Sequence, residues 1–295
     1  MTLSPLSPSP QQASPIPADV HMHTNASHGQ ASAAAMLRAA RERGLSIIGF
    51  SEHSPRPNGY IYPEDYQEKL TRQLPQYVSE ILAFAAQVKP EGTTVLLGLE
   101  VDYIPGQEEY AAMLCKQYPY DYIIGGLHFQ GTWGFDFTAS DWETLDLHEK
   151  YATYERYYED LAAMCATGLF HIAAHPDLIK IFSMDSFTSW LETPHARECV
   201  RAALETMKKH GVIMEVSSAG LRKPCREIYP GPAIMALASE LGLPISFASD
   251  AHCTNTPAFA FAELASYAAR YGYTHSSIVE KGVSRQIPFT SNPQQ

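Results

Sequence analysis

The sequence lacks the cysteine pattern of a disulfide-linked scaffold or of a zinc site built from cysteines. Its five cysteines are scattered, odd in number and never spaced Cys-x-x-Cys. This pattern is typical of reduced thiols in a cytosolic protein, where cysteine mostly fills the core. The sequence also lacks any apolar run long enough to cross a membrane. We therefore predict a cytoplasmic protein that is not held in a membrane.

Positive charge is scarce as well. Lysine and arginine number 21 against 32 aspartates and glutamates, which gives a formal net charge of −11. An acidic balance of this size argues against nucleic acid or an anionic membrane as a partner. It does not exclude a small anionic substrate, because bound metal ions can reverse the local field. The sequence does not indicate an oligomeric state.

The N-terminal stretch lacks the basic start and the apolar segment of a signal peptide. Residues 1–17 are instead rich in serine, proline and glutamine. We expect them to form a disordered leader. No linker-like stretch and no internal repeat interrupts the remainder, so residues 18–295 are predicted to form one domain. The hydrophobic fraction of 45% is ordinary for a globular protein with a full core.

Seven short apolar segments alternate with helical segments along this domain. The predicted strands are 19–23, 46–50, 94–102, 121–128, 169–175, 211–218 and 244–250. The predicted helices are 30–43, 63–88 with a break near Pro75, 107–117, 142–166, 186–191, 194–210, 232–241 and 259–270. An irregular loop is expected at 129–140 and a short strand at 277–279.

Continuous apolar strands between helices indicate a parallel sheet with both faces covered. Closed on itself, such a sheet is a (β/α)-type barrel with seven strands, and an open doubly wound sheet is the alternative. No Gly-x-Gly-x-x-Gly follows the first strand, so a dinucleotide site has no support.

Three histidines gather at the first predicted strand, in Asp19-Val-His21-Met-His23 and at His28 just beyond. Side chains two positions apart in a strand point to the same face, so His21 and His23 can converge on one ion. His28 lies in a loop from which it can reach back. Neutral imidazole is a good ligand for zinc, iron or manganese. We interpret this stretch as part of a metal site.

Further ligand-type residues mark the ends of the other predicted strands. They are His53, Glu100, His128, His175, Asp250 and His252. In a parallel barrel the carboxyl ends of the strands form one rim, where functional residues collect. The sequence therefore predicts one metal-binding pocket built from side chains distributed over the whole domain.

These motifs resemble the PHP (polymerase and histidinol phosphatase) family from about residue 18 to residue 285. The matching motifs are Asp19-Val-His-Met-His-Thr, Ser51-Glu-His, Gly98-Leu-Glu, Gly126-Leu-His-Phe, Ala174-His-Pro-Asp-Leu-Ile-Lys and Ser249-Asp-Ala-His. Within the family the chain looks most like the histidinol-phosphatases, on the segments 131–136, 177–180 and 217–223. The resemblance implies an α/β fold, a distorted TIM-like (β/α)7 barrel with its metal site at the C-terminal rim of the strands.

The resemblance also implies a set of ligands for three divalent ions of zinc, manganese or iron. The first ion is implied to be held by His21, His23, Glu100 and Asp250. The second is implied to share Glu100, as a bridging carboxylate, with His128 and His175. The third is implied to be held by His28, His53 and His252. Every one of these positions carries a residue that can bind a metal.

Charge then suggests the chemistry. Ions held by Glu100 and Asp250 keep an excess of positive charge that attracts a phosphate. Two ions that share a carboxylate can lower the pKa of a bridging water from about 15.7 toward 7. We expect the resulting hydroxide to attack phosphorus directly. The predicted activity is hydrolysis of L-histidinol phosphate to L-histidinol and phosphate, a step of histidine biosynthesis.

Two alternatives remain open at this point. The first is the same chemistry on a nucleotide, an oligonucleotide or phosphotyrosine. The second is a metal-holding binding module without turnover. The complete set of ligand-type residues weighs against the second alternative, and the acidic charge weighs against a nucleic-acid substrate.

Basic residues just past the ligand-bearing strands are candidates for substrate binding, with a solvated loop as the alternative. They are Arg56, Lys180, Arg222 and Lys223. Asp177 is predicted to act with Glu100, His128 and Asp250 in catalysis, either as a general acid or, preferably, as a partner that orients a ligand imidazole.

Four other residues near the predicted ligands have less defined expectations. Trp133 and Phe135 form either an apolar wall for an imidazole ring or simple packing of their loop. Glu52 and Asp102 alternate away from the predicted ligands, so a buried salt bridge or a core cap is expected for them.

Overall fold

The computed structural model describes residues 14–61 and 67–291 of the chain. Its main sheet holds seven strands, all parallel to their neighbours. In spatial order they are β1 (Ala18–Asp19), β2 (Ile47–His53), β3 (Thr94–Asp102), β4 (Tyr122–Gly126), β7 (Ile172–Ala173), β8 (Ile213–Ser217) and β9 (Ile245–Ala248). The sequence therefore predicted the number of strands and their direction.

The first and last strands meet, so the sheet is a nearly closed barrel rather than an open one. Met22 and Ala251 form a parallel bridge, and the His23 amide donates to the Ala251 carbonyl at 2.8 Å. The Asp19 carboxylate accepts from the Ser249 amide at 3.0 Å and from the Ser249 hydroxyl at 2.5 Å. These contacts bring the predicted ligands on both strands to one side of the barrel.

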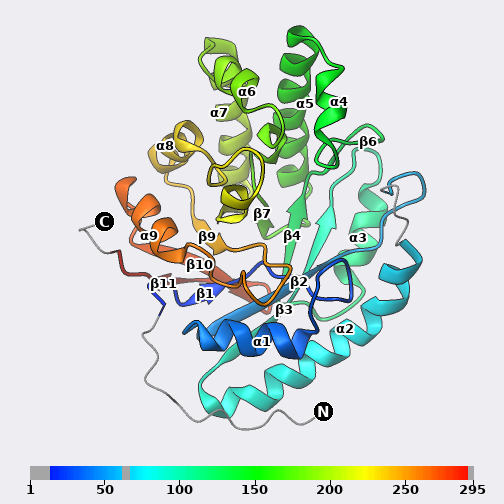
Figure 1. The fold of residues 1–295 in the computed structure, drawn as a ribbon, viewed down its shortest axis with the longest axis vertical. Coiled ribbons are helices and arrows are strands. Elements are labelled where there is room, and N and C mark those ends of the chain that lie inside the picture. The colour runs from blue at the N-terminus through cyan, green and yellow to red at the C-terminus, as the bar shows by residue number, and fades with distance from the viewer. Residues whose placement is uncertain (1–13, 62–66, 292–295) are drawn as a thin grey trace.

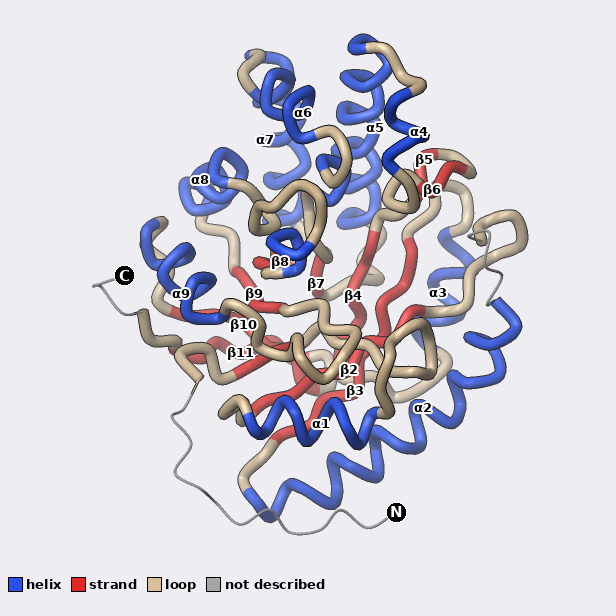
Figure 2. Tube along the Cα trace, in the orientation of Figure 1, coloured by secondary structure: helices blue, strands red, loops and turns tan. Residues whose placement is uncertain are grey.

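Helices surround the strands, as Figures 1 and 2 show. They are α1 (Ala33–Glu42), α2 (Gln67–Val88), α3 (Glu108–Lys116), α4 (Ala139–Glu143), α5 (Leu147–Ala166), α6 (Met184–Leu191), α7 (Pro194–Lys209), α8 (Pro232–Leu241) and α9 (Phe261–Arg270). Three short 3₁₀ turns are η1 (Lys89–Glu91), η2 (Leu178–Lys180) and η3 (Ala219–Arg222). The larger hydrophobic core lies between the helices and the outer face of the sheet.

Local sequence signals account for several helix ends. Asp146 and Glu149 form a reciprocal capping box at the start of α5, in which each carboxylate accepts from the other residue's amide at 2.8 Å. The break predicted at Pro75 does not occur, because α2 runs through it. Pro75 is exposed, so water can satisfy the carbonyl that loses its helical partner.

Side chains fill the interior of the barrel toward the amino-terminal ends of its strands. The Tyr122 ring lies across the barrel, and its hydroxyl donates to the Val20 carbonyl at 2.6 Å. Gly49 and Gly98 leave room for this ring, because a Cβ at either position would lie within 2.4 Å of a Tyr122 atom. The end of the barrel formed by the carboxyl ends of the strands is therefore the one that remains open for a site.

The predicted short strand at 277–279 belongs to a longer antiparallel hairpin, β10 (His275–Glu280) and β11 (Val283–Pro288). Its buried residues Ile278 and Val279 join the cluster of side chains inside the barrel. The amide of Gly282 at its turn donates to the carbonyl of Asp121, directly before β4, at 2.8 Å. The hairpin thus closes the amino-terminal end of the barrel.

Packed structure extends back into the segment predicted as a leader. Ile16 is fully buried, and the Pro17 carbonyl accepts from the amides that lead into β2 at 3.0 Å. The rest of the predicted leader, residues 1–13, lies outside the described residues. None of the helices in the described ranges has the length and apolar character required to span a bilayer.

The loop predicted at 129–140 is partly regular. It contains a small hairpin of β5 (Phe129–Gln130) and β6 (Trp133–Gly134), and α4 begins within it. The first and fifth predicted strands are shorter than expected, because β1 pairs with β2 over two residues only and β7 pairs with both neighbours over two residues. The chain that follows each of them turns over the rim of the barrel.

Candidate metal centre

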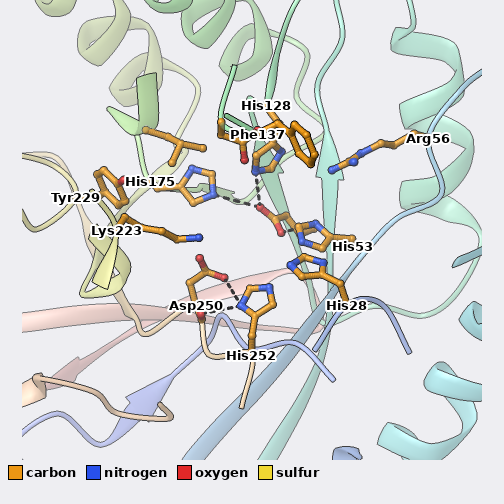
Figure 3. Close-up of a pocket in the computed structure, with 13 residues that line it drawn as sticks. His28, His53, Arg56, His128, Phe137, His175, Lys223, Tyr229, Asp250 and His252 are labelled. Carbon is orange, nitrogen blue, oxygen red and sulfur yellow. Dashed lines mark hydrogen bonds and ion pairs between the residues drawn. The ribbon is translucent and has the colours of Figure 1, made fainter. Parts of the chain in front are cut away.

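The predicted ligands converge at the carboxyl ends of the strands, although they come from all parts of the domain. Nine side chains take part: His21, His23, His28, His53, Glu100, His128, His175, Asp250 and His252. All but His28, Asp250 and His252 are buried. Figure 3 shows most of them facing one cavity.

One group of ligand-type atoms forms around Oε2 of Glu100. This oxygen lies 3.3 Å from Nε2 of His21 and 3.4 Å from Nε2 of His23. The two imidazole nitrogens are 3.1 Å apart. Oδ1 of Asp250 lies 3.3 Å from Nε2 of His23 and 3.8 Å from Nε2 of His21. The structure thus brings together the four residues predicted for the first ion.

A second group forms around the other oxygen of the same carboxylate. Oε1 of Glu100 lies 3.6 Å from Nε2 of His128 and 3.4 Å from Nε2 of His175. Glu100 therefore stands between two sets of histidines, with one oxygen toward each. This is the arrangement expected of a carboxylate that bridges two ions.

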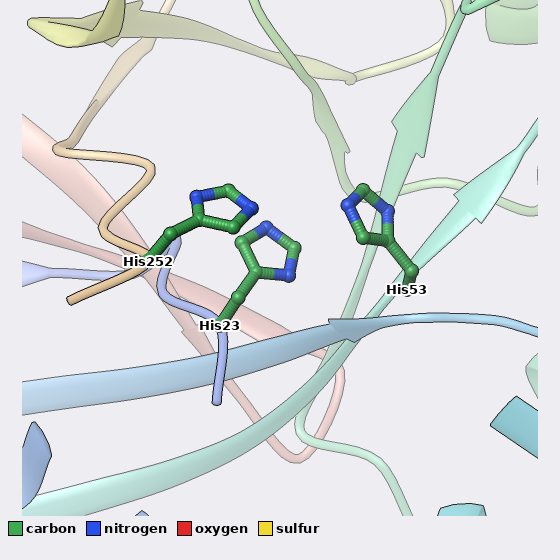
Figure 4. A group of neighbouring side chains, drawn as sticks. All are labelled: His23, His53 and His252. Carbon is green, nitrogen blue, oxygen red and sulfur yellow. The ribbon is translucent and has the colours of Figure 1, made fainter. Parts of the chain in front are cut away.

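A third group contains His53 and His252, with His23 between them (Figure 4). The His23 ring centroid lies 4.3 Å from each of the other two rings. The His28 ring lies 4.8 Å from that of His53 and 4.3 Å from that of His252. The three residues predicted for the third ion are therefore neighbours, and His23 offers a further nitrogen to them.

Buried carboxylates behind the cluster fix how two of the imidazoles present their nitrogens. Nδ1 of His21 lies 2.7 Å from Oε2 of Glu215, and Nδ1 of His128 lies 2.6 Å from Oδ1 of Asp102. An ionised carboxylate only accepts hydrogen bonds, so each Nδ1 carries the proton. Once the ring has lost its second proton to bind a metal, the lone pair of each Nε2 points toward Glu100. Such outer partners are typical of histidines that bind metals.

When the rings are neutral, as metal binding requires, the ligand atoms of the cluster face one another without protons between them. Both oxygens of Glu100 are buried and accept no hydrogen bond from any described residue. Lone pairs at this distance repel one another in a buried site, unless a cation lies between them. Ligand atoms around a tetrahedral zinc ion are separated by roughly 3.3–3.5 Å. Most of the distances between ligand-type atoms, 3.1 to 3.8 Å, fit a divalent metal ion, and Nδ1 of His53 lies closer, 2.9 Å from Oε2 of Glu100.

The imidazoles of the cluster fall into two sets, one with lowered and one with raised pKa values. Although His28 is partly exposed, loss of hydration beside the other rings lowers its pKa to about 2, and burial lowers that of His252 to about 3, so these rings stay neutral. Burial acts in the same direction on His23 and His128, but neighbouring carboxylates raise the pKa of each to about 9. Burial would raise the pKa of Glu100, yet the histidines around it hold that pKa well below its usual range. The carboxylate is therefore ionised.

The cluster lies at the bottom of a cavity of about 270 Å³. Beyond the ligand-type residues, its described lining consists of Arg56, Asp136, Phe137, Leu178, Lys223 and Tyr229. Arg56 and Lys223, both predicted to bind substrate, approach the cluster from opposite sides (Figure 3). Arg56 also donates from Nε to Asp102 at 2.6 Å, which is the salt bridge expected for that carboxylate.

Two predicted functional residues lie outside this cavity. Lys180 is fully buried, and its Nζ donates to Asp177 and to Glu227 at 2.6 Å each. The other partner of Asp177 is the amide of Gly231, at 2.8 Å. This geometry does not favour the predicted substrate contact of Lys180 or the predicted catalytic role of Asp177, and both stay predictions. The η2 turn carries both side chains beneath the loop that follows β8.

Arg222 has a bracing role that differs from the one predicted. Its Nη2 donates to the carbonyls of Ser249 and Asp250 at 2.5 and 3.1 Å, and its guanidinium lies 5.1 Å from the Phe259 ring centroid. Arg222 is not among the described residues that line the cavity, and its predicted substrate contact stays a prediction. It holds the backbone that carries the Asp250 carboxylate.

The aromatic residues of the β6 loop have different roles, because some pack inside the loop and one lines the cavity. Trp133 donates from Nε1 to Asp141 at 3.2 Å, and the buried Phe135 ring packs 5.7 Å from that of Tyr157. Neither lines the cavity, so the simple-packing alternative is confirmed for both. Phe137 supplies the apolar wall instead.

Sequence reasoning missed Glu215, which contacts two elements of the cluster. Besides His21, it accepts from the amide of His175 at 3.1 Å. The signal was present, because a glutamate in the middle of the apolar strand Ile213–Ser217 needs a buried partner. Which partner it would find depends on the order of strands in space.

The fold and the site define a parallel seven-stranded barrel whose strand ends carry histidine and carboxylate side chains arranged to hold divalent metal ions. A model of the PHP domain matches residues 19–219 of the chain. The chain belongs to this family, as its motifs predicted.

Relatives support the narrower resemblance. The chain is 34% identical over 250 residues to a probable histidinol-phosphatase from Deinococcus radiodurans, covering 83% of this chain and 90% of that protein. A histidinol-phosphatase from Bacillus subtilis is 26% identical over 242 residues, covering 75% of this chain and 87% of that protein. The predicted likeness to histidinol-phosphatases is confirmed.

The fold has a counterpart among solved structures. The histidinol phosphate phosphatase from Lactococcus lactis, solved with zinc, L-histidinol and phosphate, superimposes with a TM-score of 0.72. The two chains are 16% identical, and the match covers 91% of this chain and 98% of the other. At this identity the likeness concerns the fold, and it agrees with the predicted barrel.

Proposed function

We propose that this protein is a metal-dependent phosphomonoesterase that hydrolyses L-histidinol phosphate to L-histidinol and phosphate, a reaction of histidine biosynthesis. The observation that carries the chemistry is Glu100, whose two oxygens face separate groups of histidines. The substrate is supported by the relative from Deinococcus radiodurans, which shares 34% identity over most of both chains.

We further propose that the cluster holds three ions of zinc, manganese or iron. The ligands would be His21, His23, Glu100 and Asp250 for the first, Glu100, His128 and His175 for the second, and His28, His53 and His252 for the third. When bound, such ions supply Lewis acidity toward phosphoryl oxygens and lower the pKa of water.

The chain's own residues bind and orient the ester. Lys223 and Arg56 supply positive charge on two sides of the cavity, where phosphoryl oxygens can accept hydrogen bonds. Asp102 keeps the Arg56 guanidinium in place by its buried ion pair. Phe137 and Tyr229 narrow the cavity and exclude water from the reacting group.

The size of the cavity favours a small ester. Its volume of about 270 Å³ lies below the range of roughly 300–1,000 Å³ that is usual for drug-sized ligands. A nucleotide or an oligonucleotide would extend beyond it. The predicted cytoplasmic location and the predicted lack of nucleic-acid and membrane partners rest on the acidic charge and the five free cysteines.

The test is phosphate release by purified protein reconstituted with each metal. L-histidinol phosphate is compared with phosphotyrosine, nucleotides and p-nitrophenyl phosphate. We expect the highest kcat/KM for L-histidinol phosphate, lost in His128→Asn and retained in His148→Asn, which alters an exposed histidine of α5. A higher kcat/KM for phosphotyrosine or a nucleotide would overturn the substrate. No turnover of any ester by metal-loaded protein would favour a binding module.

A further inference from the structure

Asp136 is a carboxylate of the cavity that belongs to no metal group. Three carboxylates line the cavity among the described residues: Glu100, Asp136 and Asp250. Oxygens of Glu100 and Asp250 lie within 3.4 Å of ligand-type nitrogens of the histidine groups. Asp136 takes part in none of these groups. Asp136 therefore adds negative charge to a cavity whose lining also carries the positive charges of Arg56 and Lys223.

The backbone around Asp136 is fixed. The amide of the preceding Phe135 donates to the His128 carbonyl at 3.2 Å, and its carbonyl accepts from Nε1 of Trp142 at 2.7 Å. The Phe135 ring is fully buried, whereas the Phe137 ring is 48% exposed and lines the cavity. Asp136 thus lies between the buried Phe135 and the cavity-lining Phe137, and its charge acts on His128. A carboxylate on such a rigid support suits recognition of a ligand group.

Charge indicates the kind of group. The rest of the cavity favours anions, since Arg56 and Lys223 line it together with the proposed ions. A carboxylate there would repel an ester whose only charge is that of its phosphate, such as a uridine nucleotide. It would attract an ester that carries a cation near its phosphate. L-histidinol phosphate is such an ester, because its protonated amino group sits on the carbon next to the one that bears the phosphate.

We propose that Asp136 binds the protonated amino group of the substrate and so selects phosphate esters of amino alcohols. This inference rests on the proposed function and makes Asp136 its specificity-determining residue. Phe137, its neighbour in the chain, provides an apolar surface for the side chain that the amino alcohol carries. A phosphatase that needed only the phosphate would gain nothing from the Asp136 charge.

The test compares two esters that differ only in the amino group: L-histidinol phosphate and 3-(imidazol-4-yl)propyl phosphate. We expect the wild type to prefer the first in kcat/KM by roughly 10- to 100-fold, the range for a hydrogen bond to a charged partner. Asp136→Asn should bring the ratio close to one. Glu143→Gln, which removes an exposed charge from the nearby α4, should keep the wild-type ratio.

A binding measurement provides a readout independent of turnover. Competitive inhibition by the product L-histidinol should weaken in Asp136→Asn by the same factor as the loss of preference, while inhibition by inorganic phosphate should not change. Metal content, measured by mass spectrometry, should equal that of the wild type. Asp136→Glu should recover part of the preference, because it restores the charge.

Three results would overturn the proposal. If Asp136→Asn slowed both alkyl esters equally but spared p-nitrophenyl phosphate, whose leaving group needs no proton, Asp136 would be a proton donor. Loss of metal in Asp136→Asn would make it part of the metal centre. Equal binding of L-histidinol by wild type and variant would also refute the proposal. A wild type that did not hydrolyse L-histidinol phosphate would refute the proposed function, and the binding result would still decide the role of Asp136.

Discussion

Nδ1 of His128 lies 2.6 Å from Oδ1 of Asp102, and both side chains are buried. Arg56 donates to the other oxygen of Asp102 at 2.6 Å. Burial would raise the pKa of Asp102, but Arg56 and His128 hold it well below its usual range. The carboxylate is ionised, and it fixes both the tautomer and the orientation of the imidazole.

Asp102→Asn should therefore weaken metal binding without touching a proposed ligand. An amide cannot stabilise the protonated Nδ1 as a carboxylate does, and loss of such a partner costs about 10- to 100-fold in metal affinity. Competition with a chromophoric chelator measures the effect. Asp185→Asn, on the exposed face of α6, is the matched control. Unchanged affinity in Asp102→Asn would show that the contact does not orient His128 for metal.

Metal affinity should rise with pH. In the ion-free protein neighbouring carboxylates raise the pKa of His23 and His128 to about 9 and that of His21 well above its usual value, so these rings must lose protons to bind an ion. We expect protons to be released on filling the site at pH 7, up to one from each of these three rings. Titration calorimetry in buffers of different ionisation enthalpy counts them. Release of no protons would contradict this assignment.

The stability of the ion-free protein should respond to pH in the opposite sense. A histidine with a folded pKa of about 9 and an unfolded pKa near 6.5 stabilises the fold fully below pH 6.5. That contribution is lost as the pH rises toward 9. Urea unfolding of chelator-treated protein at pH 6.5 and 9 measures the loss. Greater stability at pH 9 would show that other groups dominate.

Lys180→Met should destabilise the fold rather than change substrate binding. The substitution leaves Asp177 and Glu227 without their shared cation, and breaking a buried pair in this way costs about 3–5 kcal/mol. Urea denaturation gives the free energy of unfolding, with the exposed Lys209→Met as control. A variant of normal stability with a raised KM would support the predicted role of Lys180 in substrate binding.

Lys223→Ala should affect the reaction but not the metal. Lys223 lines the cavity and extends toward Asp250 (Figure 3), so its loss removes a charged partner of the phosphate. We expect kcat/KM for L-histidinol phosphate to fall roughly 10- to 100-fold, with metal content and melting temperature unchanged. Lys209→Ala serves as the surface control. A wild-type kcat/KM in Lys223→Ala would remove Lys223 from the site.

Much of the site could be predicted because its signals are local. His21 and His23 alternate along one stretch of chain, and His53 and His128 stand where apolar segments end. Parallel strands bring such ends together whatever the details of packing. The register of β2 against β3 then places His53 opposite Glu100.

Other features depend on the path of the chain after each strand, which the sequence does not display. Lys180 and Lys223 both follow a ligand-bearing or neighbouring strand, yet one is buried beneath a loop and the other lines the cavity. The partner of Glu215 depends on which strands are neighbours across the barrel. These distinctions arise from tertiary packing rather than from composition or periodicity.

Closure of the barrel by Asp19 and Ser249 also makes the complete site depend on contacts between the two ends of the domain. These residues lie 230 positions apart, yet two hydrogen bonds join them and bring the first and last proposed ligands together. The complete pocket therefore depends on contacts between distant parts of the chain, and a chain cut before Asp250 would lack two of the proposed ligands.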